Sequence, residues 1–519
     1  MIGKIFIRTV VLGILVAGTV QAATDPSSPK GYVGTCKPNI VIVYVDDLGY
    51  GDVGCYGATE VQTPAIDELA AEGLLFTDGH SSASTCTPSR YSLLTGSHAF
   101  RGKVDILPGD APLLIRPGTP TLQGMLQKNG YKTAVIGKWH LGLGDGDVNW
   151  NGKISPGPLE IGFDYSYLIP ATGDRVPCVM VENHHVVGLD PADPIEVNYA
   201  RQIGTDKNGL EHPELLRYPA DEQHAKTIVN GVSRIGYMTG GHSARWKDET
   251  LPYQMLHKAR TFIDQNRDNP FFIYFAFHDI HVPYMPDLRF QGATKLGPRG
   301  DAIVQMDYIT GKLMEHLEKR GLKENTMVIF SSDNGPVARD GYFDTSYERL
   351  GDHKPAGKLR GGKYSSFEAG TRVPTIVSWP ARIEPGRSDA LINQIDIYSS
   401  LASLIGHELQ DNEAPDSLNM LNVILGNSTH GRELMLREAY RSFSLRKNNY
   451  KYIPAVNEIH DWIQTSKKIE GGESLEPQLY DLSTDIAEQN NIARQHPELI
   501  AELDAELQKI ISQPTRRLR

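Results

Sequence analysis

Four almost entirely apolar segments, each followed by polar residues, dominate the hydrophobic pattern of this chain. They comprise residues 39–45, 133–136, 271–277 and 327–330. A nearly continuous apolar run predicts a strand buried on both faces of a parallel sheet, because a half-exposed strand alternates apolar with polar residues. We therefore expect four central strands. Since ligands bind beyond the carboxyl ends of such strands, the polar residues that follow them should meet at one edge of the sheet.

Amphipathic patterns lie between these strands. In residues 64–71, 121–127 and 301–317 the apolar side chains recur every three or four positions, which is typical of helices with one buried face. Strands that alternate with helices imply an α/β fold, in which helices cover both faces of a large, mostly parallel sheet.

The pattern weakens between residues 149 and 246, where Gly, Pro, Asp and His are frequent and apolar runs are short. A long irregular stretch inside a compact domain is usually a functional loop or disorder, and we interpret this one as an insertion that shapes the substrate site. Arg175, His242 and Arg245 are its candidate substrate-binding residues, although each of them taken alone is typical of a solvated loop.

After residue 411 the pattern becomes that of a small antiparallel sheet. Its expected strands lie in residues 432–436, 442–453 and 478–482, with a hairpin turn at Asn448-Asn449 and a closing helix over about 498–511. We predict a catalytic α/β domain over residues 23–411 and a C-terminal subdomain over residues 412–519, since 519 residues exceed what one hydrophobic core normally organises.

The first 22 residues have the features of a secretory signal peptide. Lys4 and Arg8 precede an apolar run over residues 10–20, and small residues flank the expected cleavage point after Ala22. A retained membrane anchor is the alternative, but the run is shorter than the ~20 apolar residues that a spanning helix needs. We expect an exported protein, periplasmic or secreted, without a membrane anchor.

Composition narrows the class of partner and of fold. Apolar residues make up 40% and charged residues 22% of the chain, as in ordinary globular proteins. The net charge of -11 argues against nucleic acid as a partner, since that binding requires clustered Lys and Arg. Four cysteines are too few for a disulfide scaffold, and a single disulfide among Cys36, Cys55 and Cys178 stays open.

Oxygen-bearing side chains follow two of the predicted strands. Asp46 and Asp47 come after the first strand, and Asp333 and Asn334 come after the last. Carboxylates gathered at one edge would repel one another unless a cation lay between them, and Ca²⁺ accepts carboxylate and amide oxygens. A single Asp after a strand more often caps the next helix, but two such pairs favour a metal site.

The other strand ends carry basic residues. Lys138 and His140 follow residues 133–136, and His281 follows residues 271–277. A lysine and a histidine at such an edge could hold an oxyanion and move a proton. A surface loop, a core histidine, and a solvated charge for Lys363 in Gly-Gly-Lys-Tyr are the simpler interpretations of each residue alone.

Residues 86–96, Cys-Thr-Pro-Ser-Arg-Tyr-Ser-Leu-Leu-Thr-Gly, closely resemble the motif of type I sulfatases. Residues 45–52, 137–142, 332–335, 362–374 and 479–482 resemble further blocks of that family, in the family's order. The resemblance implies an arylsulfatase-like enzyme with an alkaline phosphatase-like fold. It also implies that Cys86 is oxidised to Cα-formylglycine by a formylglycine-generating enzyme or an anaerobic sulfatase-maturating enzyme.

The resemblance assigns roles to the residues already singled out. Matured Cys86 would attack sulfur as an aldehyde hydrate that Arg90 stabilises, and Ca²⁺ would be bound by Asp46, Asp47, Cys86, Asp333 and Asn334. Lys138 and Lys363 would neutralise charge on the sulfate, His281 would protonate the leaving oxygen, and His140 would take the proton from the second hydroxyl.

Two alternatives remain at the level of sequence. A formylglycine-dependent phosphonate or phosphodiester hydrolase resembles sulfatases in nucleophile and fold, and a non-catalytic glycan-binding protein could retain the fold. By analogy with the family we expect a sulfated glycan or small sulfate ester as substrate, and favour galactose or N-acetylgalactosamine sulfate in glycosaminoglycan-like or algal glycans.

Overall fold

A computed structural model of the chain describes residues 37–514. The predicted signal peptide and Cys36 lie outside these residues. Cys55 and Cys178 are both free thiols, so they are not joined to each other in a disulfide. None of the helices in the described part of the chain has the length and apolar character that crossing a membrane requires.

Ten strands of the described chain form one sheet, in the order β15-β2-β14-β13-β1-β12-β4-β5-β6-β7. Their bounds are β1 Asn39–Val45, β2 Leu74–Phe76, β4 Lys132–Lys138, β5 Tyr165–Ile169, β6 Val181–Glu182, β7 His185–Val186, β12 Phe271–Ala276, β13 Thr326–Ser332, β14 Thr375–Ser378 and β15 Gly386–Ser388. The strands β13, β1, β12, β4 and β5 are adjacent and parallel. The four predicted central strands are therefore confirmed, and every residue of β1 is buried.

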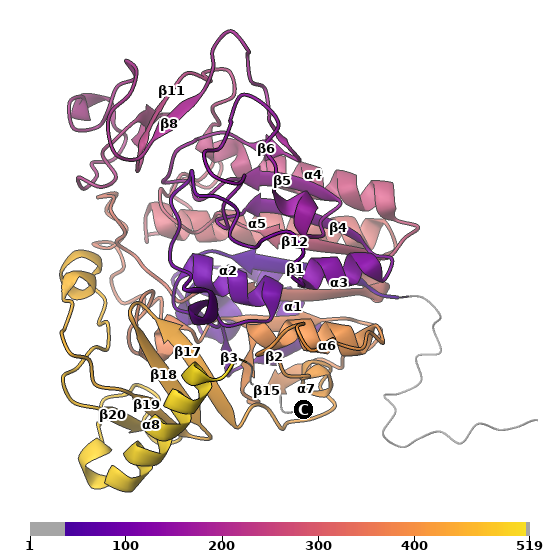
Figure 1. The fold of residues 1–519 in the computed structure, drawn as a ribbon, viewed down its shortest axis with the longest axis vertical. Helices are drawn as coiled ribbons and strands as arrows, with labels where there is room; N and C mark the ends of the chain where they lie inside the picture. The colour runs from indigo at the N-terminus through magenta and orange to yellow at the C-terminus, as the bar shows by residue number, and fades with distance from the viewer. Residues whose placement is uncertain (1–36, 515–519) are drawn as a thin grey trace, which may run out of the picture. The chain divides into compact units, whose positions relative to one another are not determined.

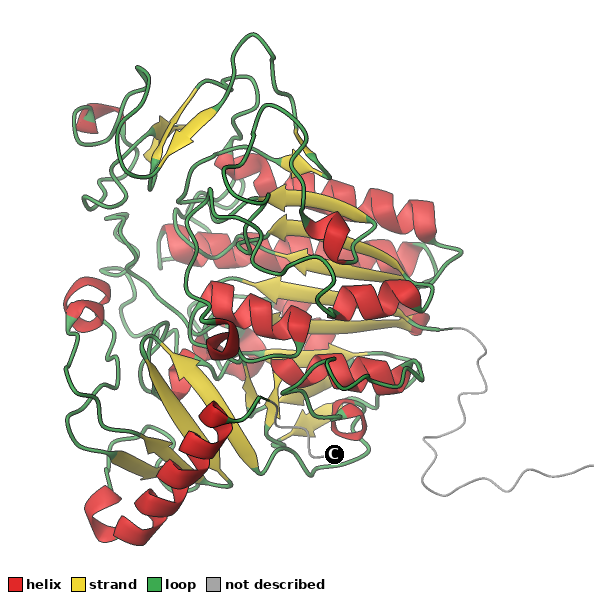
Figure 2. Ribbon diagram, in the orientation of Figure 1, coloured by secondary structure: helices red, strands yellow, loops and turns green. Residues whose placement is uncertain are grey.

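Two layers of helices cover the sheet, as Figures 1 and 2 show. The helices are α1 Pro64–Ala71, α2 Cys86–Thr95, α3 Leu122–Lys128, α4 Leu251–Asn266, α5 Pro298–Lys319, α6 Ile397–Leu404, α7 Leu421–Ile424 and α8 Pro497–Ser512. In one layer α5 contacts both α1 and α4, and in the other α2, α3 and α6 contact one another. The three helices predicted from periodicity are α1, α3 and α5, which confirms the α/β architecture.

The segment expected to be irregular contributes to the main sheet as well as to loops. Strands β5 to β7 lie within residues 149–246 and extend the sheet beyond β4. The remaining strands there are short pairs: β8 Glu196–Asn198 with β11 Tyr237–Thr239, and β9 Ile228–Val229 with β10 Val232–Ser233. A further pair joins β3 Gly79–His80 to β16 Ile392–Asn393. The loops within residues 149–246 are therefore attached to the main sheet through strands β5 to β7.

The predicted C-terminal sheet is present. Its strands are β17 Leu434–Ala439, β18 Ser442–Lys447, β19 Tyr450–Ile453 and β20 Gln478–Asp481, all antiparallel to their neighbours. Asn448 and Asn449 form the turn between β18 and β19, and Asn448 has the positive φ of 52° that Asn tolerates in tight turns. Helix α8 packs on this sheet through Leu503 and Leu507.

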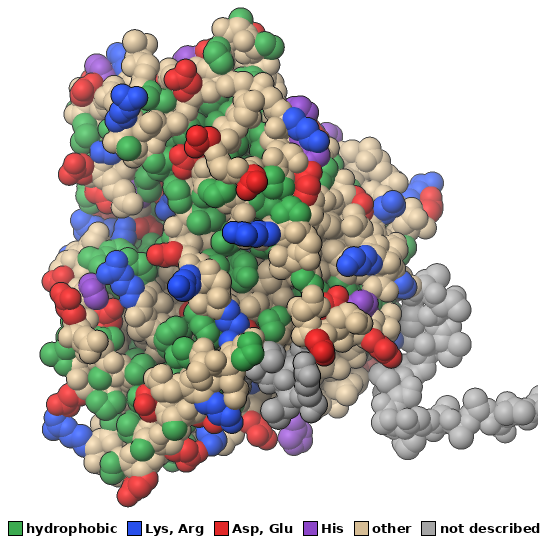
Figure 3. All heavy atoms as spheres, viewed as in Figure 1, with side chains coloured by type: hydrophobic (Ala, Val, Ile, Leu, Met, Phe, Trp, Pro, Cys, Tyr) green, Lys and Arg blue, Asp and Glu red, His purple; other side chains and the backbone are tan. Residues whose placement is uncertain are grey.

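Buried charges join the two sheets. Glu368, in the segment before β14, is fully buried and accepts from Arg437 of β17 at 2.5 Å, while Lys451 of β19 lies 3.3 Å away. Arg446 of β18 lies 2.8 Å from Asp78, which follows β2. At the surface, acidic and basic side chains are instead interspersed, as the face in Figure 3 shows.

We expect Glu368→Gln to lower the free energy of unfolding by about 3–5 kcal/mol, because the variant leaves Arg437 buried without its carboxylate and removes one of the two carboxylates beside Lys451. Urea denaturation measures the change. Glu476→Gln is the matched control, since Glu476 pairs with Arg494 on an exposed surface and should change stability by less than about 1 kcal/mol. Equal effects of the two variants would contradict a joining role for Glu368.

Candidate functional site

The polar ends of the four parallel strands meet at one edge of the sheet, as the sequence predicts. Asp46 and Asp47 follow β1, Asp333 follows β13, and Lys138 is the last residue of β4. All four side chains are buried, with exposed fractions of 1% or less. His281 follows β12 and is also buried.

Cys86 is the first residue of α2, which points its positive N-terminal end into this cluster. Thr85 before it is extended, and Gly96 ends the helix with a φ of 63°. The thiol sulfur lies 3.3 Å from Nδ1 of His140, and the hydroxyl of Thr87 donates to the backbone carbonyl of His140 at 3.1 Å. Helix α2 and the end of β4 therefore fix the thiol and the imidazole together.

The acidic residues form a candidate metal site. Single carboxylate oxygens of Asp46, Asp47 and Asp333 lie within 4.8 Å of one another. Oδ1 of Asp46 and Oδ1 of Asn334 are buried and have no hydrogen-bond partner. Unpartnered buried oxygens are costly unless a cation coordinates them, and a set of carboxylate and amide oxygens suits a hard divalent ion such as Ca²⁺. These residues fit the predicted ligand set.

Burial and mutual repulsion disfavour the ionised forms of Asp46 and Asp47. Burial raises the pKa of Asp46 well above its usual value, and the neighbouring Asp333 raises it further. Burial also raises the pKa of Asp47. For Asp333 burial acts in the same direction, but Arg90 and Lys138 outweigh it and lower the pKa. A divalent ion would let all three carboxylates stay ionised.

Three buried cations surround the carboxylates. Arg90 donates to Asp333 through Nε at 2.9 Å, and its Nη2 lies 2.7 Å from the same oxygen. Lys138 pairs with Asp46. Lys363 lies 2.9 Å from Asp47. The residues that the sequence singled out for anion binding thus also balance the acidic cluster.

The two histidines of the site have defined tautomers. Nε2 of His140 lies 2.9 Å from the carbonyl of Leu107 and must donate to it, so Nδ1 faces Cys86 as an acceptor. Nδ1 of His281 likewise donates to the carbonyl of Val282 at 2.8 Å, which leaves Nε2 free to face Asp47 at 3.8 Å. Burial, helped by Lys138 for His140 and by Lys363 for His281, lowers the pKa of each ring well below its usual value.

Three residues at this edge have strained backbone conformations. Asp47, His140 and Tyr364, which follows Lys363, have positive φ angles of 60°, 55° and 74°. Residues other than glycine rarely adopt this conformation, and it persists where surrounding contacts enforce it, often at active sites. The strain supports a functional interpretation of the cluster.

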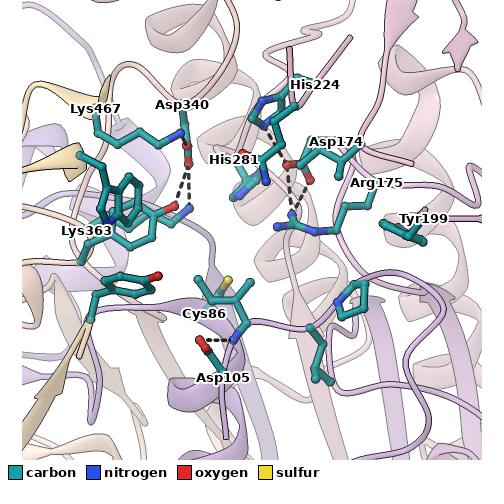
Figure 4. Close-up of a pocket in the computed structure, with 18 residues that line it drawn as sticks. Cys86, Asp105, Asp174, Arg175, Tyr199, His224, His281, Asp340, Lys363 and Lys467 are labelled. Atoms are coloured by element: carbon teal, nitrogen blue, oxygen red, sulfur yellow. Dashed lines mark hydrogen bonds and ion pairs between the residues drawn. The ribbon is translucent and has the colours of Figure 1, made fainter. Parts of the chain in front are cut away.

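A cavity of about 570 Å³ opens over Cys86, shown in Figure 4. This volume lies within the usual range of small-molecule sites. Cys86, His281 and Lys363 line the cavity, as does Arg175 from the long loop segment. The wider lining consists of Asp105, Ile106, Leu107, Pro108, Asp174, Tyr199, Gln223, His224, Ile235, Asp340, Tyr364, Tyr440, Trp462 and Lys467.

The structure does not bring His242 and Arg245 to this cavity. Arg245 pairs with Asp206 at 2.8 Å and donates to the carbonyl of Gly240. The His242 side chain is 63% exposed and lies 2.9 Å from Asp193. Both residues bind the loop segment to itself, because the turn at residues 240–241 directs them toward these acidic partners rather than toward Cys86. Of the three predicted substrate-binding residues, only Arg175 is placed at the cavity.

Several cavity residues were not singled out by the sequence. Asp174 and His224 lie beside Arg175, with Asp174 at 2.9 Å from its guanidinium, and Asp340 lies 3.1 Å from Lys363. The position of Asp174 could have been noticed in the sequence, because it comes five residues after the fifth parallel strand, β5, and the candidate metal ligands Asp46 and Asp47 come directly after β1. No local pattern distinguishes Asp340, which lies in an irregular segment, or Trp462, which directly precedes a short π-helix, Ile463–Lys467.

Comparison with known proteins gives consistent matches. A family model described as Sulfatase matches residues 38–407. The N-acetylgalactosamine-6-O-sulfatase of Bacteroides thetaiotaomicron is 48% identical over 479 residues, which cover 91% of this chain and 93% of that protein. Human arylsulfatase A is 32% identical over 470 residues, covering 88% of this chain and 83% of its own length.

Solved structures agree in fold. One from work on the metabolism of multiple glycosaminoglycans by Bacteroides thetaiotaomicron superposes with a TM-score of 0.90 at 48% identity, covering 92% of this chain and all of its own. A sulfatase from Pseudoalteromonas sp. gives a TM-score of 0.67 at 25% identity, covering 93% of this chain and 92% of its own.

We expect purified, chelator-treated protein to bind Ca²⁺ and gain thermal stability from it, by about 2.7 kcal/mol at a Ca²⁺ concentration 100 times the dissociation constant. Asn334→Ala removes one unpartnered oxygen and should weaken Ca²⁺ binding about tenfold or more. Isothermal calorimetry measures the affinity. Asn393→Ala, at a buried amide outside the cluster, is the control and should leave it unchanged. Equal affinities in the two variants would rule out Asn334 as a ligand.

Proposed function

The chain belongs to the sulfatase family and is a hydrolase of sulfate esters, and from that premise we propose that it removes the 6-sulfate of N-acetylgalactosamine in sulfated glycans. The 48% identity to an N-acetylgalactosamine-6-O-sulfatase over nearly the full length of both proteins carries this proposal. The cavity supports it, since Cys86, two lysines and an acidic cluster gather where a sulfate ester would react.

The nucleophile in this proposal derives from Cys86. Its sulfur lies at the cavity, beside His140, and it begins the run of residues that resembles the maturation motif. Burial raises the pKa of the thiol, so the unmodified cysteine would be a poor nucleophile. Matured to Cα-formylglycine, the residue supplies a reactive hydroxyl, and Ca²⁺ supplies positive charge that favours ionisation of that hydroxyl. Asp46, Asp47, residue 86, Asp333 and Asn334 would hold the ion.

The basic residues stabilise the sulfate as negative charge builds on its oxygens. Lys363 lines the cavity and Lys138 lies buried beside the acidic cluster, so both ammonium groups are held in place before substrate binds. Arg90 orients Asp333 through its two contacts and adds positive charge near the matured residue. Such groups are effective because fixed charges in a buried site need no reorganisation.

The two histidines move protons. His140 is neutral, with Nδ1 facing residue 86, which suits it to accept the proton of a hydroxyl there. His281 presents Nε2 toward the cavity and donates a proton to the leaving sugar oxygen. Its lowered pKa means that the free site holds the neutral ring, and the negative charge of a bound sulfate ester would favour the protonated form.

The proposed function also requires maturation of Cys86 and export of the protein. Maturation of Cys86 requires a formylglycine-generating enzyme or an anaerobic sulfatase-maturating enzyme as a transient partner. The sequence of residues 1–22 favours export to the periplasm or beyond, where sulfated glycans are encountered.

We expect protein from a host with a maturation enzyme to release sulfate from N-acetylgalactosamine 6-sulfate, with loss of the ester at C6 followed by NMR. Cys86→Ala should lower turnover on the order of 10⁴-fold or more, because it removes the nucleophile. Cys55→Ala, outside the cavity, is the control. Mass analysis of the peptide that contains residue 86 should show the aldehyde. Faster hydrolysis of an aryl phosphonate, without sulfatase activity, would instead identify the protein as a phosphonate hydrolase.

We expect His281→Ala to lower kcat about 10²–10⁴-fold for a sugar sulfate, since a sugar alkoxide leaves poorly without a proton. The loss should be much smaller for nitrophenyl sulfate, whose leaving group departs as a stable anion. Steady-state kinetics with both substrates measures this difference. His242→Ala is the control and should change kcat/KM less than twofold, because His242 lies outside the cavity. Equal losses on both substrates would exclude proton donation by His281.

A further inference from the structure

The cavity over Cys86 has two unlike sides. In Figure 4, Arg175 and Tyr199 lie on one side of Cys86, and Lys363 and Lys467 lie on the other. Next to these lysines, three aromatic residues line the cavity: Tyr364, Tyr440 and Trp462. The mechanism gives none of these rings a role.

The three rings form one packed cluster. The centroids of Tyr440 and Trp462 are 5.1 Å apart with an interplanar angle of 80°, and those of Tyr364 and Trp462 are 5.2 Å apart at 65°. Such edge-to-face contacts fix the orientation of each ring. Tyr364 is buried, whereas Tyr440 and Trp462 are only half-buried and also line the cavity. Their rings therefore offer apolar surface to whatever occupies the cavity.

The segment that carries Trp462 is anchored to the catalytic residues. Nζ of Lys467 lies 2.5 Å from Oδ1 of Asp340, whose other oxygen lies 3.1 Å from Nζ of Lys363. The hydroxyl of Ser365 donates to the carbonyl of Glu470 at 2.6 Å, on the far side of Lys467. Both groups of the Lys467–Asp340 pair are buried, so the pair is costly to break. The aromatic surface is thus held in a fixed position relative to the sulfate-binding lysine.

Packing alone does not account for this arrangement. Tyr364 also lines the cavity but is buried, as a ring that mainly fills the core would be, whereas Tyr440 and Trp462 keep more of their surface exposed beside the nucleophile. Pyranose rings present C–H groups on their faces and hydroxyls around their edges, so a rigid aromatic surface is complementary to the face of a sugar. A galacto-configured ring suits it well, because its axial O4 leaves the C–H groups of C3, C4 and C5 together on the opposite face.

We propose that Trp462, which Tyr440 holds in place by edge-to-face packing, stacks on the C–H face of a sugar ring of the substrate, and that it determines saccharide affinity without taking part in sulfate chemistry. The proposal rests on the proposed function. The stacked ring is either the sulfated sugar or the sugar linked to it, and monosaccharide and disaccharide substrates distinguish the two.

The test compares Trp462→Ala with Trp462→Phe, which keeps an aromatic ring. We expect Trp462→Ala to raise KM for a saccharide sulfate about tenfold with kcat changed less than twofold, and Trp462→Phe to restore most of the affinity. Inhibition by inorganic sulfate should be unchanged, because that anion contacts only the charged residues. Tyr347→Ala, at a half-exposed aromatic residue outside the cavity, is the matched control.

An increased KM for both N-acetylgalactosamine 6-sulfate and a disaccharide that contains it would place the sulfated ring on Trp462. An increase for the disaccharide alone would place the neighbouring ring there. Unchanged KM for both substrates, or an equal weakening of inorganic sulfate, would overturn the proposal. Calorimetric binding of the desulfated disaccharide to wild type and Trp462→Ala decides the inference even if wild type releases no sulfate, a result that would refute the proposed function separately.

Discussion

Mutual repulsion among three buried carboxylates is the constraint on which this site depends. Asp46, Asp47 and Asp333 are brought together because parallel strands end at the same edge of the sheet. Each of them has a cationic partner in the protein, yet Oδ1 of Asp46 and Oδ1 of Asn334 still lack any hydrogen bond. A further positive charge would make the arrangement favourable, which is the physical ground for the divalent cation that we propose for this site.

The same constraint explains how the site can take an anionic substrate in a protein of net charge -11. Lys138 and Lys363 pair with Asp46 and Asp47, so the acidic cluster fixes the positions of the two cations that we propose face the sulfate. Fixed charges of this kind stabilise a transition state without reorganising. The net charge sums side chains over the whole chain, so it carried no information about the few cations at this cavity.

The C-terminal region contributes residues to the cavity, and we propose that they contact the sugar rather than the sulfate. Buried ion pairs of Glu368 join its sheet to the catalytic sheet, and the Lys467–Asp340 pair links its short π-helix, Ile463–Lys467, to Lys363. The ends of the parallel strands thus supply charged residues beneath the cavity, while the β17–β18 turn and the start of the π-helix supply the aromatic residues Tyr440 and Trp462. Variation in such loops changes the saccharide that fits while leaving the charged residues untouched.

The sequence by itself determined the central strands, the flanking helices, the C-terminal hairpin and the set of charged residues, because apolar runs, turn residues and motif residues are local features. It identified Asp46, Asp333 and Lys138 correctly as neighbours, since strand ends of a parallel sheet converge. Only the tertiary structure decided which charges pair, as for Lys363 and Asp47, which are 316 residues apart. It likewise placed Trp462 at the cavity and His242 away from it, because the paths of long loops depend on packing against distant segments that no local pattern encodes.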